Sequence, residues 1–352
     1  MTIVENRTQK AADKQTDKQT DKQTEVWTVK DVLAWTSKRF SNAGIETALL
    51  DSQLLLGSVL NLDKVRLYMH YERPLTLEER SQVRLLIQRR LAGEPVAYLL
   101  GRKYWHTLDL LVDSRVLIPR PETETLLDFV LVCWEKNVKT PRFIVDLCTG
   151  SGCLAIALAK KFPEAKVIGV DCSEDALDVA RENAILNSSE NVDFRKGDVF
   201  DTTLMQKLVS EFGEIDILVA NPPYVTHSEW QNCAATVRDF EPQLALVSEN
   251  EGLAHGSAIV RALSTDTMSK NSVFAMELGT GAPHRIVNAV GLADSASWNE
   301  FSFHLPIWEI PRECWFGLRD LESRARFLCR VSGLQSRCFE PVSDCDSSLD
   351  EA

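Results

Sequence analysis

Residues 146–152 read Asp-Leu-Cys-Thr-Gly-Ser-Gly, and this stretch decides the fold of the chain. It follows an apolar run at 143–145 and precedes an apolar segment, 154–161, with a helical pattern. Glycine lets a ligand approach the backbone closely and adopts φ and ψ values that other residues avoid. The stretch therefore predicts a strand, a glycine-rich turn and a helix. A ligand-binding turn and a purely structural tight turn share this pattern.

Strands and helices alternate along the chain from this turn onward. The predicted strands lie at residues 142–146, 165–171, 192–195, 215–220 and 273–277. One of the intervening helices begins at Ser173, a favourable N-cap residue, with Glu174 and Asp175 in its first turn. The alternation indicates an α/β fold with a parallel, doubly wound sheet. Ligands of such sheets bind beyond the carboxyl ends of the strands.

The chain before residue 93 has a helical pattern instead. A wide apolar helix face is predicted from Leu49, Leu50, Leu54, Leu55, Leu56, Val59 and Leu60. Thr76 and Glu79 have the spacing of a capping box, which predicts the start of a later helix. We expect a small helical domain from these features.

Both ends of the chain differ from the two domains. Three copies of Asp-Lys-Gln-Thr at residues 13–24 contain no apolar residue, which favours a disordered tail. The domains that we predict are a disordered repeat tail at 1–25, a helical substrate-binding domain at 26–92, a linker or hairpin at 93–120, the α/β domain at 121–333 and a disordered tail at 334–352.

Composition excludes several classes of protein. A net charge of -12 argues against a protein whose affinity comes from a long phosphate backbone, although a local basic patch stays open. The sequence has no apolar run long enough to span a bilayer, and residues 1–23 have neither a secretory nor a mitochondrial pattern, so we expect a cytoplasmic protein. The nine cysteines form no C-x-x-C pair, and we expect no metal.

The cofactor site is predicted at the ends of successive strands. Asp171 ends the second strand, 19 residues after Gly152, where a carboxylate can accept hydrogen bonds from both hydroxyls of a ribose. The turn has one glycine fewer than the dinucleotide fingerprint, and no Lys-Ser/Thr follows it, so a nucleoside without phosphates fits better. S-adenosylmethionine is the common example. The predicted cofactor residues are Cys148, Thr149, Gly150, Ser151, Gly152, Asp171, Asp198, Val199 and Asn221, with Asp198 and Val199 near the adenine.

The fourth strand ends in Asn221-Pro222-Pro223-Tyr224, which indicates the reaction. The Asn221 carboxamide oxygen and the Pro222 carbonyl can accept the two hydrogens of a substrate NH2, and Tyr224 offers a flat face to the group that bears it. This arrangement suits a planar nitrogen of an amide or a nucleobase, whose delocalised lone pair must be oriented for methyl transfer. We predict Asn221, Pro222 and Tyr224 as catalytic residues and all four as substrate-binding residues.

These motifs resemble those of the PrmC/HemK-type N(5)-glutamine methyltransferases. The resemblance rests on residues 93–101, the Pro-Arg-Pro-Glu-Thr stretch within 117–124, the glycine turn, Asn-Pro-Pro-Tyr and residues 240–246, in family order. It extends over about 26–281, and residues 316–326 resemble the family's final strand. The resemblance implies a class I (Rossmann-like) methyltransferase fold with a small N-terminal helical domain, S-adenosylmethionine as donor, and the glutamine of the Gly-Gly-Gln motif of peptide chain release factors as acceptor. It also implies that residues 120–123 line the cleft.

The chain departs from the family pattern at three places. Cys148 occupies the position of the first glycine in the cofactor turn, Ser269-Lys-Asn-Ser272 replaces a glycine-rich turn before the fifth strand, and 292–315 is unmatched. Two rival functions stay open. A DNA adenine methyltransferase would also use Asn-Pro-Pro-Tyr, but base flipping needs a basic surface. A non-catalytic S-adenosylmethionine-binding protein could have lost activity through Cys148. We expect release factors as partners, and neither a membrane nor a stable nucleic-acid complex.

Overall fold

The computed structural model describes residues 26–135, 139–263, 267–279, 282–290 and 326–331 of the 352-residue chain. The chain forms two compact units that divide between Ala92 and Gly93. The tails predicted at 1–25 and 334–352, the unmatched stretch at 292–315 and most of 316–326 lie outside the described residues.

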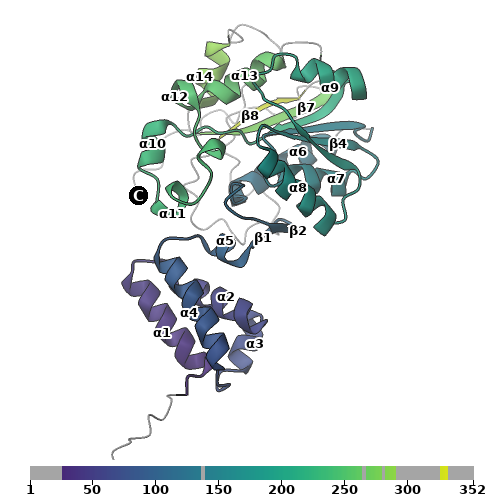
Figure 1. Ribbon diagram of the computed structural model, residues 1–352. Coiled ribbons are helices and arrows are strands. Elements are labelled where there is room, and N and C mark those ends of the chain that lie inside the picture. Colours follow the sequence, from purple (N-terminus) through teal and green to yellow (C-terminus); the bar gives the residue numbers. More distant parts are fainter. Residues whose placement is uncertain (1–25, 136–138, 264–266, 280–281, 291–325, 332–352) are drawn as a thin grey trace, which may run out of the picture. The chain divides into compact units, whose positions relative to one another are not determined.

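The described part of the first unit consists of helices α1 (Val29–Asn42), α2 (Ala48–Leu60), α3 (Lys64–Met69) and α4 (Leu77–Leu91) (Figure 1). Helix α4 begins at the capping box expected from the sequence. The Thr76 hydroxyl accepts a hydrogen bond from the Glu79 amide, and the Glu79 carboxylate accepts one from the Thr76 amide at 2.9 Å. The unit encloses an apolar core in which Phe40, Leu55 and Leu67 are fully buried.

Helix α2 buries a narrower apolar face than its sequence pattern indicates. Leu49, Leu50 and Leu54 remain 52%, 46% and 41% exposed. Polar residues are buried in their place because they have partners. Arg90 Nε of α4 donates to the Asp51 carboxylate at 2.8 Å, and both side chains are mostly buried. This ion pair joins α2 to α4.

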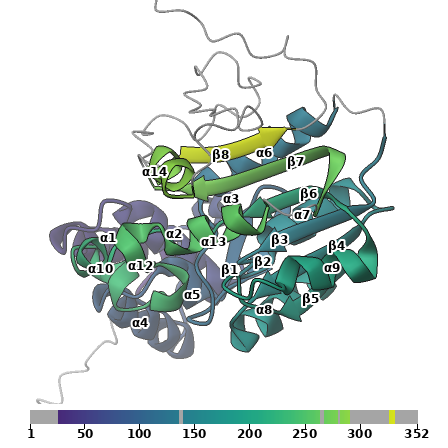
Figure 2. The ribbon, with the colours of Figure 1, turned by 90° about the horizontal axis from the view of Figure 1, so that it is seen from above.

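The second unit is built on a six-stranded sheet with the order β5-β4-β3-β6-β7-β8. Figure 2 shows the strands side by side in this order. Their bounds are β3 (Phe143–Leu147), β4 (Lys166–Asp171), β5 (Val192–Lys196), β6 (Ile215–Ala220), β7 (Met268–Leu278) and β8 (Arg326–Val331). The first five strands in sequence pair in parallel, and β8 pairs antiparallel with β7. The prediction of a parallel α/β sheet is confirmed.

Helices cover both faces of the sheet (Figures 1 and 2). One face packs against α6 (Pro121–Glu135), α7 (Cys153–Lys161) and α8 (Glu174–Leu186). The other packs against α9 (Leu204–Phe212), α13 (Ala254–Ala262) and α14 (Ala282–Ala289). Because both faces are buried, the central strands are almost continuously apolar.

Short elements complete the second unit, and the hairpin among them packs against α7 and α8. They are α5 (Val96–Leu100), the antiparallel hairpin β1 (Arg102–Trp105) and β2 (Leu108–Leu111), α10 (His227–Gln231), α11 (Ala235–Arg238), the 3-10 turn η1 (Gln243–Ala245) and α12 (Glu249–Gly252). Helices in the described part of the chain are all too short or too polar to cross a bilayer.

Strand β7 starts earlier than the sequence indicates. Met268 pairs with Ile215 and Val273 with Ile217, so residues 269–272 lie opposite Asp216 alone. The stretch expected as a turn is thus an irregular part of the strand. Regular pairing resumes and continues to Met276 opposite Ala220.

Candidate active site

The strand order reverses between β3 and β6, and a cavity opens at this point. Because the connections from these two strands lead to opposite sides, a crevice forms beyond their carboxyl ends. The cavity encloses about 990 Å³, part of it open to solvent. Cys148, Asp171, Asp198 and Asn221 line it from the ends of β3, β4, β5 and β6.

Most of the residues predicted to bind the cofactor line this cavity. They are Cys148, Thr149, Gly150, Ser151, Asp171, Asp198, Val199 and Asn221. Gly152 does not, because it faces the core: a Cβ there would lie 3.0–3.2 Å from Phe194, Ala180 and Ile156.

The glycine turn has left-handed backbone at three positions. Cys148, Gly150 and Gly152 have φ values of 58°, 54° and 81°. A residue with a Cβ in this region costs roughly 1–2 kcal/mol, so Cys148 is strained where glycine would not be. Burial raises the pKa of the Cys148 thiol, with Asp171 adding to the effect, and keeps the thiol neutral. At Gly150 a Cβ would meet nothing within 4 Å, so the turn is open on the cavity side.

Asp146 holds this turn from beneath. Its Oδ2 accepts hydrogen bonds from the Thr149 hydroxyl at 2.6 Å and the Ala155 amide at 3.1 Å. Burial raises the pKa of Asp146 to about 7 in spite of these donors. Asp146 lines the cavity, and its buried Oδ1 has no hydrogen-bond partner among the described residues. This atom is therefore available to accept a hydrogen bond from a ligand's ammonium group.

Asp171 also supports the turn, which the sequence does not indicate. Its Oδ2 accepts a hydrogen bond from the Gly150 amide at 2.9 Å, and its Oδ1 accepts one from the Ser173 amide at 3.0 Å. Each carboxylate oxygen keeps a second lone pair, which the ribose hydroxyls of a nucleoside can use. Burial raises the pKa of Asp171 in spite of these backbone donors.

His255 is a cavity residue that sequence reasoning missed. Its Nδ1 lies 2.7 Å from Ser248 Oγ, and its ring lies 4.8 Å from that of Phe200. Burial lowers the pKa of His255, with Asp198 opposing the effect. A single histidine outside any motif carries no signal in one sequence, which is why it was overlooked.

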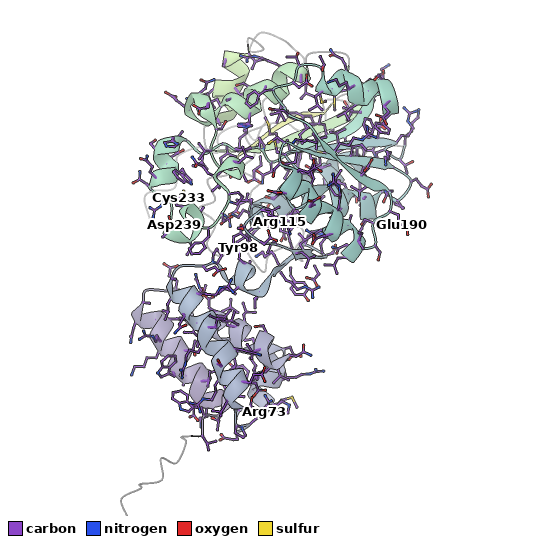
Figure 3. All side chains as sticks on the ribbon, in the orientation of Figure 1. Arg73, Tyr98, Arg115, Glu190, Cys233 and Asp239 are labelled. Carbon is purple, nitrogen blue, oxygen red and sulfur yellow. The ribbon has the colours of Figure 1, made fainter. Side chains whose placement is uncertain are left out.

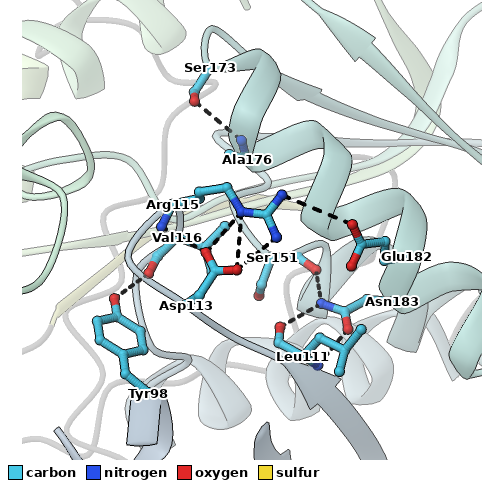
Figure 4. A network of polar contacts seen from close by, with 10 residues as sticks. All are labelled: Tyr98, Leu111, Asp113, Arg115, Val116, Ser151, Ser173, Ala176, Glu182 and Asn183. Atoms are coloured by element: carbon cyan, nitrogen blue, oxygen red, sulfur yellow. Dashed lines mark hydrogen bonds and ion pairs between the residues drawn. The ribbon is translucent and has the colours of Figure 1, made fainter. Parts of the chain in front are cut away.

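Asn183 of α8 links the glycine turn to the hairpin through hydrogen bonds of its side chain (Figure 4). Its Nδ2 donates to the Ser151 carbonyl at 2.9 Å and to the Leu111 carbonyl at 3.0 Å, and its Oδ1 accepts from the Leu111 amide. Tyr98 of α5 donates to the Val116 carbonyl at 2.6 Å. These bonds hold residues 111–116 in place, and Arg115 and Val116 at the end of this segment form one wall of the cavity.

Arg115 and Arg120 complete this wall. Arg115, labelled with Tyr98 in Figure 3, pairs with Asp113 at 2.7 Å. Arg120 pairs with the buried Glu241 at 2.6 Å, which ties the Pro-Arg-Pro-Glu-Thr stretch to residues 240–246. Within that stretch, Pro119, Arg120 and Thr123 line the cavity, whereas Pro121 and Glu122, which were also expected there, do not.

The acceptor side of the cavity is built around Asn221. Its Nδ2 donates to Thr123 Oγ1 at 3.0 Å, and the Thr123 hydroxyl donates to Glu277 Oε2 at 2.8 Å. The Tyr224 hydroxyl donates to Glu277 Oε1 at 3.2 Å. Burial raises the pKa of Glu277 to about 7, and burial with Glu277 raises that of Tyr224. Asn221 and Pro223 line the cavity, and Pro222 and Tyr224 adjoin Pro223 in the chain without being among the residues that line it.

Sequence reasoning missed Glu277 altogether. Met276 pairs with Ala220, so Glu277 stands level with Asn221 on the adjacent parallel strand. The sequence does place a carboxylate at the end of an apolar strand, which could have marked Glu277 as a site residue. Its position beside Asn221 becomes clear only from the pairing of β6 with β7.

Comparison with known proteins identifies the family. A model described as the PrmC N-terminal domain matches residues 31–101, and a methyltransferase domain model matches residues 142–287. A release factor glutamine methyltransferase of Chlorobaculum tepidum is 38% identical over 271 residues, 76% of this chain and 90% of the relative. The chain belongs to the release factor glutamine methyltransferase family. A member from Geobacter sulfurreducens is 33% identical over 74% of this chain and 88% of its own length.

Membership of the release factor glutamine methyltransferase family confirms the resemblance seen in the motifs. It also confirms the class I fold, enzymatic methyl transfer and S-adenosylmethionine as the methyl donor. The cavity fits this donor, since the turn is open at Gly150 and Asp146 Oδ1 is an unsatisfied buried acceptor.

Proposed function

We propose that this enzyme methylates the side-chain amide nitrogen of the glutamine in the Gly-Gly-Gln motif of peptide chain release factors. The observation that carries the proposal is the orientation of Asn221 at the cavity. Its Nδ2 is engaged by Thr123, which leaves Oδ1 to accept a hydrogen bond from a substrate NH2. The names of relatives that match most of the chain support a release factor as the protein that carries this amide.

The chain's own residues orient the acceptor. In this proposal the Asn221 Oδ1 and the Pro222 carbonyl accept the two hydrogens of the glutamine amide, and Pro223 and Tyr224 support its plane. Such a grip directs the nitrogen lone pair, which is delocalised into the amide, out of the plane. S-adenosylmethionine supplies an electrophilic methyl group on a sulfonium. One N–H of the amide is replaced by N–CH3, and a proton is released.

We assign the donor to the other side of the cavity. Asp171 would hold the ribose, Asp198 and Val199 would flank the adenine, and Asp146 Oδ1 would accept from the ammonium group. Cys148, Thr149, Gly150 and Ser151 form the turn beneath, and Gly152 contributes through its backbone conformation.

We further propose that residues 26–92 help to bind the release factor in the cytoplasm. The match to the PrmC N-terminal domain supports this role. Exposed apolar side chains on α2 and α3, namely Leu49, Leu50, Val65 and Met69, offer a surface of the kind that protein partners cover.

A methylation assay tests the proposal. The purified enzyme is incubated with labelled S-adenosylmethionine and a release factor, and the product is mapped by peptide mass spectrometry. We expect label on the glutamine of Gly-Gly-Gln and none on a release factor in which that glutamine is replaced by alanine. Duplex DNA serves as the second control. Label on DNA and not on the release factor would overturn the proposal.

A further inference from the structure

Three side chains from distant parts of the sequence form a chain of hydrogen bonds behind the acceptor side. Asn221 follows β6, Thr123 lies in the first turn of α6 and Glu277 lies near the end of β7. Val273 and Ala275 of β7, and Ile217 and Val219 of β6, face α6, α7 and α8. Since side chains alternate along a strand, Glu277 and Asn221 point to this same face.

This chain of hydrogen bonds is shielded from water. Thr123 is 2% exposed and Glu277 is 1% exposed. A buried polar group must find its partners within the protein, so the direction of each hydrogen bond is strongly constrained. A threonine hydroxyl has one proton to donate, and its use toward one neighbour fixes its role toward the other.

We propose that Glu277 is a positioning residue which, through Thr123, determines which end of the Asn221 carboxamide faces the acceptor. This inference rests on the proposed function. Both oxygens of an ionised Glu277 only accept, so the Thr123 hydroxyl must donate to it. Thr123 Oγ1 then accepts from Asn221 Nδ2. Asn221 Oδ1 is left toward the acceptor, where an amide NH2 needs an acceptor oxygen.

Protonation of Glu277 reverses this order. Because the Tyr224 hydroxyl donates to Oε1, an added proton resides on Oε2 and points at Thr123. The Thr123 hydroxyl would then donate onward to Asn221 and favour the flipped carboxamide, whose Nδ2 faces the acceptor. Two NH2 groups would meet, and the acceptor would lose its orientation.

The surroundings of Glu277 set the pH at which this happens. Burial and the charge of Glu122 disfavour its ionised form, while Thr123, Tyr224 and Arg120 favour it. Cys153 of α7 also lies within electrostatic range of Glu277, and its thiol is neutral because burial raises its pKa to about 12. With a Glu277 pKa of about 7, turnover should rise as the pH rises through neutrality.

Three variants test the inference with the full-length enzyme and a release factor. Thr123→Val removes the hydroxyl at nearly constant shape, and Thr123→Ser restores it. Glu277→Gln places an amide nitrogen at the Oε2 position, because Tyr224 donates to Oε1, and so imitates the protonated acid at every pH. We measure kcat from pH 5.5 to 8.5, the dissociation constant of S-adenosylmethionine and the melting temperature.

We expect Thr123→Val and Glu277→Gln to lower kcat on the order of 10- to 100-fold at pH 8, with unchanged donor affinity. Thr123→Ser should recover most of the activity, and the rise of kcat near pH 7 should be absent from Glu277→Gln. Wild-type kcat in Thr123→Val, or a wild-type pH profile in Glu277→Gln, would overturn the inference. If Glu277→Gln does not fold, the valine and serine variants decide alone. A wild-type enzyme without turnover on any release factor would instead overturn the proposed function, and this inference with it.

Discussion

The donor side and the acceptor side of the cavity each rest on buried carboxylates, but these carboxylates hold different kinds of group. Asp146 and Asp171 bind mainly backbone amides, from Ala155, Gly150 and Ser173. Within the described part of the chain, the hydrogen bonds of Glu277 come from side-chain hydroxyls, those of Thr123 and Tyr224.

The two kinds of contact have different effects: one fixes the shape of the turn, and the other fixes the orientation of side chains that hold the acceptor. Carboxylates that bind backbone amides fix the path of a turn, and a ligand then fits against that path. A carboxylate that binds hydroxyls fixes the direction of hydrogen bonds, which matters to a planar amide that must be held one way round. Loss of a donor-side carboxylate should therefore weaken donor binding, whereas substitutions on the acceptor side should lower turnover and leave donor binding unchanged.

The largest effect is expected from Asn221→Ala on the acceptor side. The variant should keep its affinity for S-adenosylmethionine and its melting temperature, while turnover on the release factor falls by about 10³. A preorganised hydrogen bond that acts in the transition state typically contributes about 10²–10³ in rate. Calorimetry, thermal unfolding and single-turnover kinetics measure the three quantities.

Asn232→Ala is the matched control for this variant, since Asn232 is an exposed asparagine of the same unit. It should behave as wild type. Wild-type turnover in Asn221→Ala would mean that the glutamine is held elsewhere. The distinction that we draw between the donor side and the acceptor side would then be wrong.

On the donor side, Asp171→Ala should weaken binding of S-adenosylmethionine on the order of 100-fold. Two charge-assisted hydrogen bonds to the ribose are lost, each contributing roughly 1.5–3 kcal/mol. The Gly150 amide also loses its acceptor, so the melting temperature should fall as well. Glu190→Ala, which removes an exposed carboxylate labelled in Figure 3, is the control. Unchanged donor affinity by calorimetry would remove Asp171 from the site.

The stability of the enzyme should depend on pH through the buried acids on both sides. Burial raises the pKa values of Asp146 and Glu277 to about 7, so between about pH 4.5 and pH 7 the folded state binds protons that the unfolded state has released. Their contribution to stability is complete below the unfolded pKa values and is lost as the pH rises to about 7.

Glu277→Gln isolates the contribution of the acceptor side. The melting temperature of both proteins should fall as the pH rises from 5 to 7.5. The fall should be roughly 3–6 °C smaller in the variant, because it lacks the Glu277 carboxyl group. Glu190→Gln should follow the wild type. Parallel curves for Glu277→Gln and the wild type would show that Glu277 is ionised throughout this range.

The smallest effect is expected from Cys148→Gly in the donor turn. Glycine relieves a left-handed conformation that costs about 1 kcal/mol in other residues, but it also makes the unfolded chain more flexible. We expect a melting temperature within about 3 °C of wild type and donor affinity within about threefold. Cys148→Ala keeps the Cβ and controls for loss of sulfur. A large gain in donor affinity in the glycine variant alone would show that Cys148 impairs the site.

The donor side could be predicted from the sequence because its parts are close together. The turn after β3 contains its own glycines, and Asp171 ends the next strand. Local spacing is therefore enough to place these residues near one another. The exception is Gly152, whose role in the core depends on contacts with Phe194 and Ala180 that spacing does not reveal.

The acceptor side could be predicted only in part because its hydrogen bonds span long sequence separations. Asn221 was recognised from its own motif, but Thr123 lies 98 residues before it and Glu277 lies 154 residues after Thr123. Their meeting depends on β7 lying beside β6 and on α6 covering that face. The apolar pattern of α2 failed for a related reason, since the burial of Asp51 depends on Arg90 in α4.

The irregular start of β7 has a consequence for how the length of this protein can change in evolution or in design. Residues 269–272 lie opposite one residue of β6, so this part of the strand has already departed from strict pairing. We expect an inserted or deleted residue there to leave the pairing from Val273 onward unchanged, because that pairing is set by Ile217 and the residues after it. An insertion between Val273 and Glu277 would turn the carboxylate to the opposite face, toward α13 and α14. The irregularity thus separates the end of the strand that carries Glu277 from changes in length at its start.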